Sequence, residues 1–147
     1  MKPLTLEEYW MGRDVSHASE LTAVIHDNAA ETVQRINFLL HHYAEKTGDL
    51  RDRKWNSGWR PAAINAATPG AAKSSKHMTA QAGDVSDADG SLDAWCMTNE
   101  GKAALILCAL WMEHPSNTPG WSHFQTVPPK SGSLIFYAVA PSVRRPA

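Results

Sequence analysis

The chain has 147 residues, which is enough for one domain with a buried core. Its formal net charge of −1 gives no bulk sign of binding to nucleic acid or to an anionic membrane. No stretch approaches the roughly 20 apolar residues that span a bilayer, and the first residues lack the apolar core of a secretory signal. We therefore expect residues 1–147 to form one monomeric domain that is made in the cytoplasm.

Helical periodicity dominates the first third of the chain. Between Ser19 and Lys46 apolar residues recur three or four positions apart, and Gly48 follows as a stop signal. The recurring residues are Ile25, Ala29, Val33, Ile36, Leu40 and Tyr43. The pattern predicts one amphipathic helix over about residues 19–47, packed on one face of the domain.

The middle of the chain predicts several short elements. Residues 54–59 are typical of a short strand, Ala62 to Ala67 of a short helix after Pro61, and Gln81 to Val85 of a second strand. The acidic segment 87–90 follows, and we interpret it as a solvated turn because the complete calcium-loop pattern with its terminal Glu is missing.

The last third predicts one more helix and two strands. Asn99 can cap a helix that runs to about Glu113 and buries Trp111 among its apolar residues. Strands are predicted at Trp121–Val127 and Ser133–Val139, around the turn at residues 128–132. The expected fold is a small α+β domain, with helices packed against a mainly antiparallel sheet.

Cys96 and Cys108 are the only cysteines in the chain. Two cysteines do not make a disulfide framework, and reduced thiols are the default in the cytoplasm. We therefore expect two buried thiols, with a Cys96–Cys108 bridge as the alternative.

Three residues are candidates for a metal site. His77 follows a flexible loop, Asp84 lies seven residues later on a predicted strand, and His123 lies on a distant strand. Two imidazoles and one carboxylate are a common ligand set for catalytic zinc, which keeps its fourth position for water. Spacing alone leaves an equal alternative, in which His77 is on the surface, Asp84 is in a turn and His123 is in the core.

A resemblance to a known family favours the metal site. Residues 75–84, Ser-Lys-His-Met-Thr-Ala-Gln-Ala-Gly-Asp, resemble the Ser-x-His-x-x-Gly-x-Ala-x-Asp signature of zinc peptidases of the D-Ala-D-Ala carboxypeptidase type. That group includes many phage endolysins and has a hedgehog-like fold. The resemblance covers roughly residues 55–137 and implies one zinc ion held by His77, Asp84 and His123.

The same resemblance suggests residues that contact the substrate. The segment Ser57–Pro61 resembles the family's Ser-Gly-Tyr-Arg-x, which implies that Arg60 holds a substrate carboxylate or polarises the scissile carbonyl. Asn65 lies where the family often has an asparagine, and Ser75 opens the signature. We expect these residues and Trp121 to line the substrate site, although core packing is the alternative for the tryptophan.

Two positions depart from the family pattern. Ala80 takes the place of the signature glycine, a change that a strand accommodates if φ is negative there. Gly120 lies where many members carry the acid that serves as general base. Glu113 is our candidate for that base if the loop at 115–120 brings it beside His123, and the alternative is an ordinary exposed glutamate at a helix end.

Together these residues predict a zinc-dependent peptidase that hydrolyses an amide bond in peptidoglycan stem or cross-link peptides. The resemblance also implies that this small chain is a phage or prophage endolysin that acts on the cell wall after release. Two alternatives stay open: a zinc-stabilised module that binds the wall without cutting it, and a D,D-dipeptidase with the same metal ligands. The residues do not specify which bond is cut.

Overall fold

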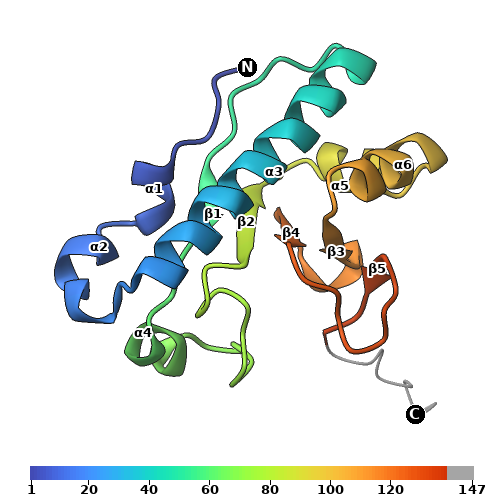
Figure 1. The fold of residues 1–147 in the computed structure, drawn as a ribbon. Coiled ribbons are helices and arrows are strands. Elements are labelled where there is room, and N and C mark those ends of the chain that lie inside the picture. The colour runs from blue at the N-terminus through green and yellow to red at the C-terminus, as the bar shows by residue number, and fades with distance from the viewer. Residues whose placement is uncertain (139–147) are drawn as a thin grey trace.

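The computed structural model describes residues 1–138 and has six α-helices and one five-stranded sheet (Figure 1). Four of the five strands pair antiparallel in a continuous row, and the fifth pairs parallel. The predicted α+β class is therefore confirmed. Within the described residues, no helix is both long enough and apolar enough to span a membrane.

The N-terminal third is helical. Its elements are α1 (Leu6–Trp10), α2 (Arg13–Ser16), a 3₁₀ turn (Ala18–Glu20) and α3 (Ala23–Thr47). The start of the long helix was predicted at Ser19, which is wrong because that residue belongs to the 3₁₀ turn. The helix begins after Thr22, whose hydroxyl accepts a hydrogen bond from the Ile25 amide. It ends as predicted at Gly48, which has a φ of 75°.

The sheet consists of β1 (Trp55–Ser57), β2 (Ala82–Ser86), β3 (Trp111–Glu113), β4 (Trp121–Gln125) and β5 (Ile135–Phe136) in the order β1-β2-β4-β3-β5. The strands predicted near residues 54–59 and 121–127 are confirmed with shorter bounds, and the strand predicted at residues 81–85 is confirmed with a shift of one residue. The strand predicted over Ser133–Val139 is two residues long, and Val139 lies outside the described residues. It pairs with β3 and not with β4.

Helix α3 packs against the sheet and closes the core (Figure 1). Its buried face includes Ala29, Val33, Ile36 and Leu40, which belong to the predicted apolar stripe. The contact with β2 is close at Gly83, where an added Cβ would lie 2.6 Å from the Trp55 ring and 3.1 Å from Ile36. Because Gly83 has no side chain, Ile36 of α3 and Trp55 of β1 can pack directly against the strand that carries Asp84.

The region after β2 contains the largest correction. The chain forms α5 (Ser91–Cys96), which was not predicted, and α6 (Asn99–Leu107), which is capped by Thr98. The helix predicted to reach Glu113 ends six residues earlier because Ala109 takes a left-handed conformation, with a φ of 51°. Its N–H and that of Leu110 bond back to the carbonyls of Ile106 and Leu105. The apolar residues that follow therefore form β3.

The acidic turn is only partly solvated, which corrects a second prediction: Ala88 and Asp89 are exposed, whereas Asp87 is not. Asp87 is buried, accepts hydrogen bonds from the amides of Leu92 and Asp93 at the start of α5, and pairs with Arg53 at 3.0 Å. Its carboxylate thereby satisfies amides that the helix itself leaves unbonded. Two other expectations for local structure are confirmed: α4 spans Ala62–Ala67, and both cysteines are buried, unpaired thiols. A short 3₁₀ turn, Pro115–Asn117, lies in the predicted loop.

Candidate metal centre

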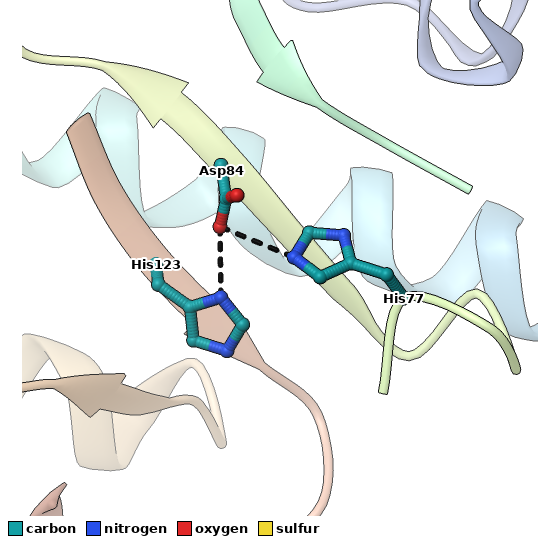
Figure 2. Close-up of side chains that lie close together, drawn as sticks. All are labelled: His77, Asp84 and His123. Carbon is teal, nitrogen blue, oxygen red and sulfur yellow. Dashed lines mark hydrogen bonds and ion pairs between the residues drawn. The ribbon is translucent and has the colours of Figure 1, made fainter. Parts of the chain in front are cut away.

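The three candidate ligands converge at the middle of the sheet (Figure 2). Asp84 of β2 and His123 of β4 are directly paired across two antiparallel strands, and His77 comes from the turn that leads into β2. One oxygen of Asp84, Oδ1, lies 2.7 Å from His123 Nδ1 and 3.2 Å from His77 Nε2. All three ligand atoms lie within 4.8 Å of one another. The structure thus brings the predicted set together.

A backbone contact holds His77 in the orientation that a metal ligand needs. The side chain is buried, and its Nδ1 lies 2.8 Å from the carbonyl oxygen of Gly58. Because a carbonyl only accepts hydrogen bonds, Nδ1 carries the proton and the lone pair of Nε2 faces Asp84. Gly58 itself packs against the Tyr9 backbone, which is possible because glycine has no side chain. An added Cβ would lie 1.9 Å from the Tyr9 carbonyl oxygen.

Gln125 gives His123 the complementary orientation. Its Nε2 donates to the Val127 carbonyl at 2.8 Å, so its Oε1 points to the imidazole and lies 3.3 Å from His123 Nε2. An amide oxygen accepts, so Gln125 can take the Nε2 proton of His123 when Nδ1 binds a cation in place of the proton that it shares with Asp84 at 2.7 Å. The two histidines therefore present Nε2 and Nδ1 to the same point. Such hydrogen bonds to the far nitrogen are typical of histidines that bind metals.

The electrostatics of the three side chains suit a cation. Burial lowers the pKa of His77, which keeps this imidazole neutral and able to donate its lone pair. Burial raises the pKa of Asp84, but the two imidazoles outweigh it and hold the pKa below its ordinary value. Burial also lowers the pKa of His123, and here the Asp84 carboxylate outweighs burial and raises it. The carboxylate is thus ionised and attracts positive charge to this point.

The spacing also fits a metal ion. Ligand atoms at the usual zinc distances in a tetrahedron lie about 3.3 Å apart. The 3.2 Å separation between His77 Nε2 and Asp84 Oδ1 already matches that value. The 2.7 Å separation between His123 and Asp84 would open by roughly 0.6 Å when an ion takes the place of the shared proton. The ligand atoms of the two histidines lie within 4.8 Å of each other, and the group could hold a metal ion.

Glu113 lies on the same face of the sheet as this cluster, although not in the context that we predicted. It belongs to β3 and not to a helix end. Because Trp111 pairs with Gln125 and Met112 with Phe124, the next step of the antiparallel register puts Glu113 opposite His123. Burial raises the pKa of Glu113, while His123 opposes that shift. Asp84, His123 and Glu113 thus form one row across β2, β4 and β3.

Arg60 and Ser75 lie next to His77. The Arg60 amide donates to the His77 carbonyl at 3.0 Å, and its Nη2 donates to Ser75 Oγ at 3.1 Å. The same hydroxyl accepts from the His77 amide at 3.3 Å. The three residues form one connected unit, so the arginine is anchored close to the candidate metal ligands.

Asn65 and Trp121 have different positions. Asn65 of α4 is buried, and its amide group donates to the Ala72 carbonyl at 2.9 Å, which holds the loop that precedes His77. Trp121 lies two residues before His123 on β4, so the two side chains share a face of the sheet, while Phe124 is buried on the other. Trp121 is thus placed to line a site, and Asn65 supports one.

Ala80 contradicts the expectation of an extended backbone. It lies in the turn before β2, not on the strand, and its φ is 56°. Side chains are disfavoured in this left-handed region, whereas glycine is not. The family signature has a glycine at this position. In this chain the residue is alanine, but the backbone has the left-handed conformation that glycine favours.

Gln125 is the site residue whose role sequence reasoning missed. A signal was available, because residues two apart on a strand share a face and Gln125 follows His123 by two. Its role depends on the Val127 carbonyl, which the pattern does not reveal.

No model of a known protein family matches the chain. Searches of curated proteins and of solved structures also find no match.

Proposed function

We propose that the protein is a zinc-dependent peptidase that hydrolyses an amide bond in peptidoglycan stem or cross-link peptides. One observation carries the proposal: His77, Asp84 and His123 direct three ligand atoms to one point, with both imidazole orientations set by hydrogen bonds. A zinc ion held there would polarise the scissile carbonyl and lower the pKa of a water molecule.

Glu113 is the proposed general base. It lies in the same row as Asp84 and His123, and burial raises the pKa of its carboxyl. A raised pKa makes a carboxylate a better proton acceptor at neutral pH. Glu113 would take the proton of the attacking water and pass it to the departing amine, the role that the acid at the position of Gly120 has in the family.

Arg60 is the proposed electrophilic group. Its guanidinium is anchored beside His77 and always carries a positive charge, so it can stabilise negative charge on the substrate. That charge is either the carbonyl oxygen as it becomes an oxyanion or a carboxylate of the peptide. Ser75 holds the guanidinium, and Trp121 borders the site.

The substrate class rests on the resemblance at residues 57–61 and 75–84. The left-handed backbone at Ala80 supports it, because the signature has a glycine at that position. We propose action on the cell wall as a phage or prophage endolysin with a hedgehog-like fold. A wall-binding module without activity is the second candidate, and it is favoured by the absence of a carboxylate at Gly120.

Incubation of the purified protein with peptidoglycan sacculi tests the proposal. The reaction is run with and without a zinc chelator, and new peptide termini are identified by mass spectrometry. We expect defined termini that disappear with chelator and return with zinc. The His123→Ala and Glu113→Gln variants should be inactive, whereas Glu45→Gln, on the exposed surface of α3, should be fully active.

Three outcomes are informative. Stoichiometric zinc binding without cleavage of any wall type would replace the peptidase with the binding module. Cleavage of free D-Ala-D-Ala but not of sacculi would favour a D,D-dipeptidase. Activity that survives Glu113→Gln would remove this residue as the base and leave the enzyme in place.

A further inference from the structure

Tyr9 of α1 lies outside the region that resembles the peptidase family, yet it contacts the segments that hold two of the candidate ligands. Helix α1 packs against α3 and β1 (Figure 1). Tyr9 is fully buried there, and its ring packs edge-on against Trp10 and Trp55 at centroid separations of 5.9 and 5.1 Å. This packing leaves the backbone carbonyl and the hydroxyl of Tyr9 to act on two different segments.

The backbone carbonyl of Tyr9 holds the peptide bond that orients His77. The Trp59 amide donates to the Tyr9 carbonyl at 3.2 Å, on one side of this peptide. On the other side, the Gly58 carbonyl accepts the Nδ1 proton of His77 at 2.8 Å. That amide and that carbonyl belong to one planar trans peptide unit, in which they point in opposite directions. Fixing the amide therefore fixes the acceptor, and a hydrogen-bonded row runs from Tyr9 to a candidate metal ligand.

The end of α1 holds the preceding peptide as well. The Gly58 amide donates to Met11 Sδ at 3.3 Å. The two segments are in direct backbone contact, because an added Cβ at Gly58 would lie 1.9 Å from the Tyr9 carbonyl oxygen and 2.8 Å from its carbonyl carbon. Residues 58 and 59 therefore cannot shift without a matching movement of α1.

The hydroxyl of Tyr9 reaches the strand that carries Asp84. It donates to the Ala82 carbonyl of β2 at 2.6 Å, in a buried contact. The register of β1 with β2 includes Val85 and Asp84 but not Ala82, so the hydroxyl acts on β2 just beyond its pairing with β1. Burial raises the pKa of Tyr9, and the charge of Asp84 raises it further, so the hydroxyl stays protonated and donates.

We propose that Tyr9 is a positioning residue of the metal centre, which ties the peptide that orients His77 to the strand that carries Asp84. The ligand atoms of these two residues lie 3.2 Å apart, so a small shift of either segment changes the geometry offered to a metal ion. Helix α1 is thus part of the metal centre, although the family resemblance does not include it. The inference rests on the metal binding that the proposed function requires, and not on hydrolysis.

Tyr9→Phe removes the hydroxyl and keeps the ring. Loss of a direct partner of a metal ligand lowers metal affinity by about 10- to 100-fold, and Tyr9 acts at one remove, so we expect zinc to bind about 3- to 10-fold more weakly. Competition with a chelator of known affinity measures the zinc dissociation constant. The absorption spectrum of bound cobalt(II) is the second readout, because it reports the coordination geometry, and it should differ from that of the unaltered protein.

Tyr43→Phe is the matched control. Tyr43 is also buried and its hydroxyl also donates at 2.6 Å, but the acceptor is Asp49, which is not a candidate ligand. Both variants should lower the urea midpoint, since each loses a hydrogen bond of a buried tyrosine. Only Tyr9→Phe should weaken zinc binding and change the cobalt spectrum. A merely structural role would move the midpoint without moving either metal readout.

A second pair of variants tests the backbone contact. Gly58→Ala places a Cβ 1.9 Å from the Tyr9 carbonyl oxygen. Gly101→Ala places one 2.0 Å from the Trp95 carbonyl oxygen, where α6 meets α5. Both changes force a backbone to move, but only the first displaces the peptide that orients His77. Among variants that circular dichroism shows to be folded, Gly58→Ala should lose more zinc affinity than Tyr9→Phe, and Gly101→Ala should keep it.

The outcomes separate this inference from the proposed peptidase. An unchanged zinc dissociation constant in folded Tyr9→Phe would overturn the inference, and so would an equal loss in Tyr43→Phe, which would show that stability alone matters. Hydrolysis of sacculi together with either result would keep the peptidase. Weaker zinc binding in Tyr9→Phe alone, without hydrolysis by the unaltered protein, would keep the inference and refute the peptidase. An unaltered protein that binds no zinc would refute both.

Discussion

Replacing Gln125 with leucine should weaken metal binding without removing a ligand. The change deletes the oxygen that accepts a hydrogen bond from His123 Nε2 at 3.3 Å, and with it the preference for a free Nδ1. Loss of such a partner lowers metal affinity by about 10- to 100-fold in characterised sites. The contact here is long, so we expect the lower end, about tenfold or about 1.4 kcal/mol. His77 should be unaffected, because Gly58 orients it.

Competition with a chelator of known affinity measures the zinc dissociation constant, and ¹⁵N NMR of the imidazoles reports which nitrogen of His123 carries the proton. Gln34→Leu is the matched control, since Gln34 is exposed on α3. Gln125→Glu retains an acceptor and should bind zinc more tightly than Gln125→Leu. If folded Gln125→Leu binds zinc as tightly as the unaltered protein, Gln125 does not position His123.

Three further predictions concern stability. Ala109→Gly should raise the free energy of unfolding in urea by about 1 kcal/mol, because this exposed residue has a φ of 51° that favours glycine; no gain would mean that the left-handed conformation costs little. Gly83→Ala should lower the free energy of unfolding by about 1–3 kcal/mol, because its Cβ would lie 2.6 Å from the Trp55 ring; an unchanged urea midpoint would contradict that clash. Burial raises the pKa of Asp93 to about 6. Between about pH 4 and pH 6 the native state therefore binds more protons at this carboxyl than the unfolded state does. The contribution of protonated Asp93 to the free energy of unfolding falls as pH rises through this window. The free energy of unfolding measured relative to Asp93→Asn should therefore decline across that window and level off above it, and a flat difference would show that Asp93 does not titrate there.

Local patterns in the sequence determined much of the candidate site. His77 and Asp84 lie in one ten-residue segment, so a linear motif can contain both of them. The alternation around His123 identified its strand, because side chains on a strand change face at every residue. The short helix at Ala62–Ala67 was also predicted correctly, since Pro61 and Thr68 mark its ends locally.

Tertiary structure decided what surrounds those ligands. The apolar residues 110–112 suit a buried strand as well as a helix, and only the pairing of β3 with β4 makes them a strand and brings Glu113 opposite His123. Asp87 is acidic in sequence but buried in the fold, because the start of α5 and Arg53 satisfy its charge. Arg13 and Arg60 are 47 residues apart in the chain, and no periodicity links them. They become neighbours because Arg13 hydrogen-bonds the Trp59 carbonyl, a long-range contact that exists only in the folded chain.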